Sequence, residues 1–436
     1  MTRPPPPPAD ARPVSAASTS PSSPSTAHRD GSAPQQSEAR QVAYRVPAPW
    51  QHARTLASGI AAPLPTETVD LADALWRVLG EDVEARHDVP HYSSSAMDGW
   101  AVAGAAPWAI VSAGQPYLRP GQAAPILTGA LIPPGAEAVL RSESGAAASS
   151  RLSLHPQAPP HEPRPGQHIR PRGEEARAGD TVITRGTVLN PAHIAVAAAC
   201  AHDTLRVIRR PRVAFVFTGD EVDEAGAPPP GRVRDSFGPQ LPGTFRMLGA
   251  TPVGSRRCPD TLEATTSALA QSSLTADVVI TTGGTGRSAA DHLRSALESL
   301  GASIHIDGVA MRPGGPTMLA RLPGGAFVVC LPGNPLAAMM GLITVAEPLL
   351  ARLSGRKSSR PRRVTVASAV AGRPGTTLLI PCAIRDGEAT PNGWLGSGMM
   401  RGLADADGVL VVPEQGVEPG EPGESLGLPW CSPAPR

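Results

Sequence analysis

The sequence predicts a multidomain α/β protein organised around one three-layer αβα domain. Within residues 211–358, apolar runs such as VAFVF, DVVIT and AFVVCL alternate with helical patterns, which is typical of a parallel sheet covered on both faces. The flanking regions hold shorter β runs between frequent Gly and Pro residues. These runs predict a small β domain before the αβα domain and a β barrel after it.

Composition and charge exclude several classes of protein. The chain has 436 residues, enough for about two to four domains, and its 39 basic residues nearly balance its 38 acidic ones. We therefore expect neither nucleic acid nor an anionic membrane as a partner. The five cysteines form no C-x-x-C pair, which argues against zinc and disulfides. No apolar run reaches the roughly 18 residues of a membrane span and no signal peptide is recognisable, so we expect a cytoplasmic protein.

The regions before the αβα domain differ in composition. Residues 1–45 are rich in Pro, Ser and Ala with few large apolar side chains, which predicts a disordered tail. Residues 46–86 together with 166–210 predict a helical and extended linker domain, with helices over 52–60 and 69–83 and an apolar helix around 194–201. Residues 87–165 predict the small β domain, whose Ala-, Pro- and His-rich end, 145–165, we expect to be a poorly structured insertion.

Three loops follow strands of the predicted sheet. They are Thr218-Gly219-Asp220-Glu221, the glycine loop from Gly283 to Gly286, and Pro332-Gly333-Asn334-Pro335. Ligands bind at the carboxyl ends of the strands in such sheets, so we expect these loops to share one crevice. Glycines let backbone N–H groups approach a ligand, and the helix after the loop favours an anion there. The glycine loop alone would equally fit an ordinary strand-to-helix turn.

Several charged side chains beside these loops can have either a structural or a ligand-binding role. Asp291 and Asp260 either cap the helices that follow them or bind a ligand. Two adjacent acids, Asp220 and Glu221, beside an anion site suggest an intervening Mg²⁺. Arg312 either pairs with a phosphate or oxyanion or is a solvated loop arginine.

Taken in order, the motifs of residues 48–425 resemble those of the molybdopterin molybdenumtransferases, which insert molybdate into adenylated molybdopterin. The resemblance implies a molybdopterin-binding αβα domain at 211–358, a C-terminal barrel at 359–436 and a homodimer. It also implies an active cleft between the αβα domain of one subunit and the β domain of the other, with other cofactor-biosynthesis proteins as candidate partners. The motifs are SSSAMDGWAV (93–102), ILTGALIPPGAEAVL (126–140), IRPRGEEARAGD (169–180), FTGDE (217–221), DVVITTGG (277–284), VAMRPGGPT (309–317), LPGNPLAA (331–338) and GSGMMRGLADADG (396–408).

The resemblance assigns roles residue by residue. The substrates would be adenylated molybdopterin and molybdate, with Mg²⁺ as cofactor. The functional acids fall on Asp98, Glu175, Glu221, Asp260 and Asp291, with Asp220, Glu221 and Asp291 at the metal. The substrate-binding positions are Thr128, Thr218, Gly219, Gly283, Gly284, Thr285, Arg287, Ser288, Arg312, Pro332, Gly333, Asn334 and Pro335.

The chain departs from the family pattern at a few positions. Glu175 replaces an aspartate, Thr285–Ser288 replaces a serine-rich loop, and Arg312 with Gly315 replaces a pair of lysines. Asp235-Ser236-Phe237 lacks the usual asparagine. Arg287 would restore the missing positive charge. Two alternatives to the enzyme therefore stay open: a non-catalytic molybdopterin-binding scaffold, and a molybdopterin adenylyltransferase, which the TGGTG loop alone would favour.

Overall fold

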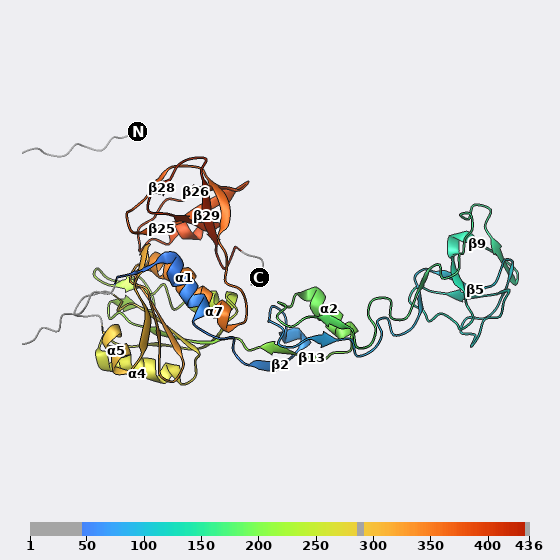
Figure 1. Cartoon of the computed structure of the whole chain (residues 1–436), viewed down its shortest axis with the longest axis horizontal. Coiled ribbons are helices and arrows are strands. Elements are labelled where there is room, and N and C mark those ends of the chain that lie inside the picture. Colours follow the sequence, from blue (N-terminus) through green and yellow to red (C-terminus); the bar gives the residue numbers. More distant parts are fainter. Residues whose placement is uncertain (1–45, 286–291, 432–436) are drawn as a thin grey trace, which may run out of the picture. The chain divides into compact units, whose positions relative to one another are not determined.

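The structure is a computed structural model that describes residues 46–285 and 292–431 (Figure 1). The predicted tail, residues 1–45, lies outside this range. A six-stranded sheet forms the centre of the αβα domain, in the order β17-β14-β18-β22-β21-β19. Its strands are β14 (Arg212–Phe217), β17 (Thr251–Arg257), β18 (Val278–Thr282), β19 (Ser303–Asp307), β21 (Met318–Arg321) and β22 (Phe327–Leu331).

The predicted αβα class is confirmed, but the sheet is not wholly parallel. The first four strands in that order run parallel, whereas β21 is antiparallel to both β22 and β19. The cause is a tight turn at residues 322–326 that joins β21 directly to β22, because so short a connection can only make an antiparallel pair. The expected strand at 303–309 is therefore an antiparallel edge strand.

Alternate residues of the central strands enter two separate cores. Phe215 and Ile280 face α3 and the long helix that follows residue 334, while Val216 and Val279 face α4 and α5. All four side chains are buried, and each such burial contributes about 1.5 to 3 kcal/mol. In Figure 1, α4 and α5 lie together, as do α1 and α7, in agreement with their contacts. These helices are α1 (Trp50–Gly59), α3 (Leu241–Met247), α4 (Leu262–Ser273) and α5 (Leu293–Ser299).

The long helix is a core helix of the αβα domain. It consists of α6 (Pro335–Gly341), a π-helical segment (Leu342–Ala346) and α7 (Glu347–Leu353). By length and composition Pro335–Leu353 would suit a membrane span, but 89% of it is buried inside the protein. Its Thr344 hydroxyl accepts a hydrogen bond of 3.1 Å from the Trp50 indole of α1. Burial against protein therefore accounts for its apolar sequence.

The predicted helix over 69–83 is wrong. The chain there forms β2 (Thr66–Asp70), a 3₁₀ turn (Leu71–Asp73) and β3 (Val83–Glu84). β2 pairs antiparallel with β13 (Thr204–Ile208), and β3 with β12 (Thr181–Ile183). These pairings bring Leu79 and Val83 into one core with Val207 and with Ala197 of α2 (Pro191–Ala199), so long-range packing overrides the local helical pattern.

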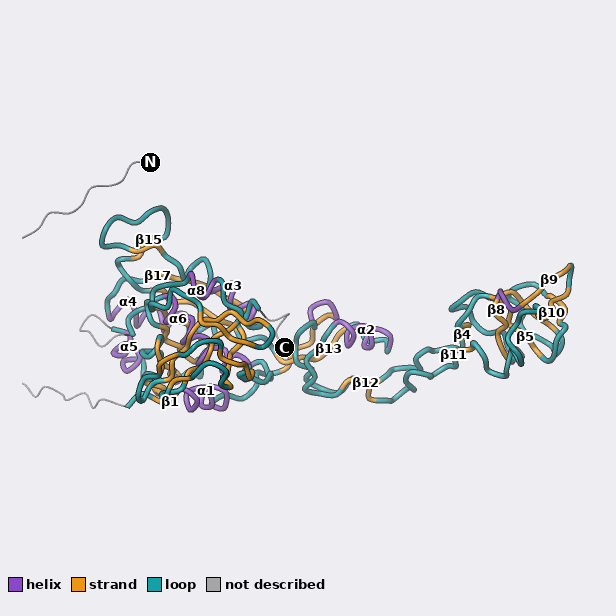
Figure 2. Tube along the Cα trace, turned by 90° about the horizontal axis from the view of Figure 1, so that it is seen from above, coloured by secondary structure: helices purple, strands orange, loops and turns teal. Residues whose placement is uncertain are grey.

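The small β domain contains a six-stranded sheet in the order β8-β5-β7-β6-β10-β9. Figure 2 labels four of its strands, β5, β8, β9 and β10. The expectation that 145–165 is poorly structured is wrong for 145–154, where β9 and β10 form a hairpin, whereas 155–165 contains turns but no helix or strand. An alanine-rich strand carries little β signal, and Gly145 lies so close to Trp100 that an added Cβ would meet its ring at 2.5 Å. The strands are β5 (Gly99–Ala103), β6 (Trp108–Ile110), β7 (Gln122–Ile126), β8 (Ala138–Arg141), β9 (Gly145–Ala148) and β10 (Arg151–Leu154).

The C-terminal region is the expected β barrel. Its five strands close in the order β25-β26-β23-β29-β27, with β27 pairing back to β25. On its outside, β20 (Val309–Arg312) pairs parallel with β25, and β1 (Ala48–Pro49) with β20, so a segment of the αβα region extends the barrel sheet. The strands are β23 (Arg362–Val366), β25 (Thr377–Arg385), β26 (Glu388–Pro391), β27 (Gly408–Val412) and β29 (Pro422–Gly427).

Shorter elements complete the described chain. They are β4 (Ser94–Ser95) with β11 (Ile169–Arg170), β15 (Val222–Asp223) with β16 (Val233–Arg234), β24 (Val370–Ala371) with β28 (Gly416–Val417), a 3₁₀ turn (Ser142–Ser144) and α8 (Arg401–Ala404).

Candidate active site

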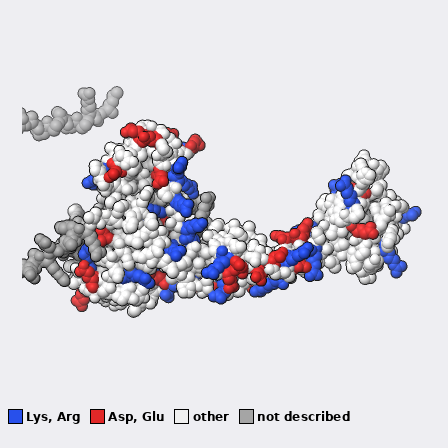
Figure 3. All heavy atoms as spheres, in the orientation of Figure 1, with Lys and Arg blue, Asp and Glu red and all other residues white. Residues whose placement is uncertain are grey.

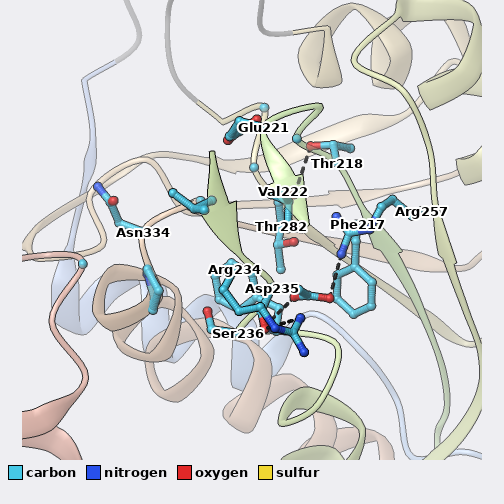
Figure 4. Close-up of a pocket in the computed structure, with 18 of the residues that line it drawn as sticks. Phe217, Thr218, Glu221, Val222, Arg234, Asp235, Ser236, Arg257, Thr282 and Asn334 are labelled. Carbon is cyan, nitrogen blue, oxygen red and sulfur yellow. Dashed lines mark hydrogen bonds and ion pairs between the residues drawn. The ribbon is translucent and has the colours of Figure 1, made fainter. Parts of the chain in front are cut away.

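A pocket of about 750 Å³ lies at the carboxyl ends of the central strands. The structure brings the three predicted loops together here: residues 217–219 and 221–222 at the end of β14, 282–285 at the end of β18, and 333–335 after β22 all line it. Residues 233–237 and Arg257 form another side, and Gly398 and Met400 of the barrel region complete the lining. Figure 4 shows Thr218, Glu221, Thr282 and Asn334 around this space.

The loop after β14 is held by Asp260. The Asp260 carboxylate accepts hydrogen bonds from the backbone N–H groups of Gly219 and Asp220, at 3.0 and 3.2 Å. In return, the Asp220 carboxylate accepts from the Asp260 N–H at 3.3 Å. Asp260 does not cap α4, because the N-cap is Thr261, whose hydroxyl accepts from Ala264 N–H. The cap reading of Asp260 is therefore wrong, and its carboxylate instead fixes a pocket loop.

The glycine loop packs tightly against Thr218. Gly283 and Gly284 have φ of +86° and +60°, and a Cβ at Gly283 would lie 2.7 Å from Thr218 Oγ1. That hydroxyl donates to the Thr282 carbonyl at 3.0 Å. Only glycine combines this backbone angle with so close a neighbour. Gly283 N–H donates to Leu331 O at 3.1 Å, so an anion would have to be held from Gly284 onward.

The loop after β22 is joined to the barrel region. Asn334 Nδ2 donates to Ser397 Oγ at 3.1 Å, and Ala337 N–H in the first turn of α6 donates to Ser397 O at 3.1 Å. Pro335 occupies the first position of α6, where a missing N–H costs nothing. The barrel loop that carries Gly398 and Met400 is thereby fixed at the pocket edge.

The side of the pocket opposite the glycine loop carries an ion pair. Arg257 Nη2 lies 2.7 Å from Asp235 Oδ2, and the Arg257 guanidinium lies over the Phe217 ring, 5.8 Å from its centroid. Figure 4 shows these three side chains together. The other oxygen of Asp235 accepts from the N–H groups of Phe237 and Gly238, at 2.8 and 3.0 Å.

Charge around the pocket is mixed in sign. Glu221, Asp235 and Asp260 line it together with Arg234 and Arg257. On the face of the molecule shown in Figure 3, basic and acidic residues are interspersed, in keeping with the net charge of +1. An anionic substrate would therefore be held by local contacts rather than by a broad surface field.

Sequence comparisons place the chain among known proteins. The MoeA N-terminal region (domain I and II) matches residues 48–201, a probable molybdopterin binding domain matches 214–352, and the MoeA C-terminal region (domain IV) matches 363–426. Molybdopterin molybdenumtransferase 2 of Mycobacterium tuberculosis is 32% identical over 394 residues, which cover 84% of this chain and 96% of that protein. The chain belongs to the molybdopterin molybdenumtransferase family.

Further relatives support the same family of transferases. The molybdopterin molybdenumtransferase of a Nostoc species is 35% identical over 309 residues, covering 66% of this chain and 70% of that one. A crystal structure of a molybdopterin biosynthesis MoeA protein from Pyrococcus horikoshii has a TM-score of 0.72 at 25% identity, covering 88% of this chain and 99% of that chain. The fold and the order of domains are thus those of the family.

Several residues predicted by family resemblance do not line this pocket. Asp98 and Thr128 lie together in the small β domain: the Asp98 carboxylate accepts from Thr128 N–H and Oγ1 at 2.7 and 2.8 Å, and these bonds lower the pKa of Asp98. Glu175 is exposed, and its N–H donates to Val89 O. Arg312 is exposed at the end of β20.

Of the other predicted positions that do not line the pocket, two lie next to it and three fall outside the described residues. Asp220 is exposed beside the pocket, and Pro332 is buried beneath it. Arg287, Ser288 and Asp291 lie outside the described residues. Among the residues that the structure describes, no three His, Cys, Asp or Glu side chains form a metal-binding cluster.

Sequence reasoning missed the contributions of Arg257 and of the barrel loop. The strand expected at 251–254 extends to Arg257, and this extension places Arg257 at the same sheet edge as Phe217. The run TPVGSRR predicts a strand that continues to Arg257 only if its two arginines are accepted as part of an edge strand, where charged side chains are common. Ser397 and Met400 lie in the GSGMM motif, but nothing in their local sequence indicates that Ser397 contacts α6 or that Met400 lines the pocket.

Proposed function

We propose that this chain is a molybdopterin molybdenumtransferase that inserts molybdate into adenylated molybdopterin and releases AMP. The observation that carries the proposal is the meeting of the three strand-end loops in one pocket of about 750 Å³. This volume suits a substrate of nucleotide size, since ligand pockets commonly measure about 300 to 1,000 Å³. Membership of the transferase family supports the same reaction.

The protein's part in this reaction is to bind and orient. The glycine loop would hold the phosphoanhydride by backbone N–H groups, and the loop after β14, fixed by Asp260, would keep Thr218 and Gly219 beside it. Holding the reacting groups in line can remove about 7 to 11 kcal/mol of the activation barrier, so little covalent help is needed. Gly333, Asn334 and Pro335 would bound the other side, with Pro332 supporting them from below.

The carboxylates present fit Mg²⁺. Magnesium is commonly bound by one or two carboxylates together with substrate phosphates, so a preformed cluster of three acids is not required. Glu221 lines the pocket and Asp220 is exposed beside it. These two acids, with Asp291, would hold the ion, which would screen the phosphoanhydride charge when bound.

The other predicted residues belong to the same proposal. Asp98, Thr128 and Glu175 would face the pocket from the second subunit of a homodimer. Arg287, Ser288 and Arg312 would contact the oxyanion or the pterin phosphate. We further propose a cytoplasmic enzyme that exchanges its substrate and product with other cofactor-biosynthesis proteins.

The test uses the purified full chain with adenylated molybdopterin, molybdate and Mg²⁺. We expect AMP to be released in step with active cofactor, measured by reconstitution of an apo-molybdoenzyme. Tight pterin binding with no AMP release would instead identify a scaffold. Formation of adenylated molybdopterin from ATP, which the TGGTG loop alone would favour, would identify an adenylyltransferase.

A further inference from the structure

A second pocket lies at the opposite end of the central strands from the one described above. It measures about 600 Å³, a volume that suits a small-molecule ligand. Arg212 and Thr251, the first residues of β14 and β17, line it, whereas the last residues of the same two strands, Phe217 and Arg257, line the first pocket. No residue lines both pockets, so the second one is a separate candidate site.

Positive charge is in excess in this second pocket, which we call the arginine pocket. Its charged lining consists of four arginines and two carboxylates, namely Arg77, Arg209, Arg210, Arg212, Glu67 and Asp73. Part of this charge is neutralised within the protein. Arg77 forms an ion pair with Glu67, and Arg209 donates two hydrogen bonds of 2.8 Å to Asp277, which does not line the pocket. Arg212 lies 3.8 Å from the same Asp277 carboxylate.

Arg210 is the lining arginine that no carboxylate neutralises. It forms no ion pair with any described residue, and its Nη2 reaches the Leu75 carbonyl only at 3.5 Å, the limit of a hydrogen bond. A guanidinium has five N–H donors, so most of those of Arg210 are unused. Burial and the charge of Arg77 lower the pKa of Arg210, and the opposite effects of Asp73 and Glu67 do not compensate. A bound anion would offset this unfavourable setting of the charge.

Trp76 supplies a flat apolar surface in the same lining. It is half-buried, and its backbone has a φ of +63°, a conformation that is rare for a bulky residue. Its N–H donates to Leu189 O at 2.8 Å, which holds the backbone in this conformation. Glycine would adopt the same angle without strain, so the backbone does not account for a tryptophan here. Aromatic side chains in binding sites stack on the flat rings of nucleotides.

We propose that the arginine pocket binds a phosphate monoester that carries a flat ring, as in a nucleoside monophosphate, with the phosphate at Arg210 and the ring at Trp76. A planar guanidinium with free donors can bind two phosphate oxygens at once. Val69 and Leu75 add apolar surface to the lining. Asp73 is exposed and repels an anion, so the excess of arginines must outweigh it. The inference goes beyond the proposed function, because it concerns a different site.

The test measures binding of AMP and ribose 5-phosphate to the full chain by calorimetry. The variants are also made together with Gly283→Ala, which disturbs the first pocket, so that binding there is told apart. Arg210→Ala should weaken both ligands by about tenfold, because a charge-assisted contact is lost, and Arg210→Lys should recover only part of the affinity. Trp76→Gly, which suits the positive φ, should weaken AMP by about tenfold and leave ribose 5-phosphate unchanged. Asp73→Asn should strengthen both, because it removes a repelling charge.

Arg119→Ala is the matched control, because Arg119 is an exposed arginine of the small β domain outside both pocket linings. It should bind both ligands as the unaltered protein does. Equal AMP affinity in Arg210→Ala, Trp76→Gly and the control overturns the inference. A loss in Arg210→Ala without any loss in Trp76→Gly overturns the assignment of a ligand with a ring. Turnover without added AMP should be unchanged in Arg210→Ala, so absence of turnover in the unaltered protein would count against the proposed function alone.

Discussion

Two glutamates in different regions show how differently this protein uses a carboxylate. Glu162 in the small β domain has a side chain only 2% exposed. Its oxygens accept hydrogen bonds from Arg141 at 2.9 and 3.2 Å, from Ser144 at 2.7 Å and from Gln167 at 3.3 Å, with His168 also at 3.3 Å. Glu221 lines the pocket, is exposed, and makes no side-chain hydrogen bond or ion pair to another described residue.

The difference separates a structural charge from one that is available to a ligand. The hydrogen bonds to Glu162 lower the pKa of its carboxyl to about 2, chiefly through Arg141. Its accepting capacity is used within the domain, so it contributes to stability. Glu221 keeps its capacity for a cation or water. In this protein, whether a carboxylate's oxygens already accept hydrogen bonds from the protein therefore indicates a ligand-binding role better than the mere presence of an acidic residue does.

The largest effect should come from Glu162→Ala. It leaves Arg141 without its main partner, so we expect unfolding to become easier by about 3 kcal/mol, measured by urea denaturation. Glu143→Ala is the matched control, because Glu143 also pairs with Arg141, but at 3.6 Å and with a 65% exposed side chain. Its effect should stay below about 0.5 kcal/mol. Equal effects would show that Glu162 is as dispensable as a surface acid.

Acid should reveal the same contribution. A carboxyl whose pKa falls from 4.5 to about 2 on folding stabilises the native state above pH 4.5. We expect this contribution, about 3 kcal/mol, to be lost as the pH falls from about 4.5 toward 2. In Glu162→Gln the loss over this window should be smaller by that amount. Parallel pH curves for the two proteins would contradict the assignment.

On the pocket side, Gly283→Ala should have the largest effect. The new Cβ meets Thr218 Oγ1 and displaces the loops that hold the substrate, so we expect turnover to fall by about a hundredfold. Gly226→Ala is the control, because Gly226 also has a positive φ, +71°, but nothing lies within 4 Å of its added Cβ. It should show the backbone cost without the loss of turnover. Similar turnover in both variants would remove the Thr218 contact from the explanation.

Glu221→Gln should have the smallest effect. Because Glu221 is exposed and unpaired among the described residues, stability should change by less than about 0.5 kcal/mol. The Mg²⁺ concentration for half-maximal activity should rise by about tenfold, with turnover largely recovered at saturating Mg²⁺, since one of few ligands is lost. Glu263→Gln, an exposed acid on α4, should leave the Mg²⁺ requirement unchanged. An unaltered requirement in Glu221→Gln would argue against this metal site.

The central sheet was predictable because its strands are buried on both faces. VAFVF and AFVVCL are apolar throughout, DVVIT is apolar at its three central residues, and each run is followed by a loop with Gly or Pro, so both the strands and the crevice could be inferred from short stretches. The loops 218–221, 283–285 and 333–335 needed no long-range information beyond the rule that parallel strands end at one edge.

Features that depend on distant partners were not predictable in this way. Leu71, Leu75, Val78 and Leu79 repeat at helical spacing, yet pairing of β2 with β13 determines the structure there. Glu162 sits in a Pro- and His-rich stretch whose order depends on Arg141 and Ser144. Two further contacts join segments that are distant in the sequence: the Asp235–Arg257 ion pair and the contact of Ser397 with α6. In both cases the local sequence of one segment does not predict the other segment as its partner.

The strand β20 has a consequence for how this protein can be divided or recombined. It lies between β19 and β21 in the chain but pairs with β25 of the barrel, and one hydrophobic cluster contains Phe215 and Val278 together with Leu379, Val409 and Leu426. A gene fragment that ended before residue 359 would expose that cluster and the unpaired edge of β20, and would aggregate. A chimera that takes its barrel from a relative should fold only when β20 and the shared hydrophobic cluster come from that same relative. The αβα domain and the barrel therefore form one folding unit, which can be exchanged between relatives only as a whole.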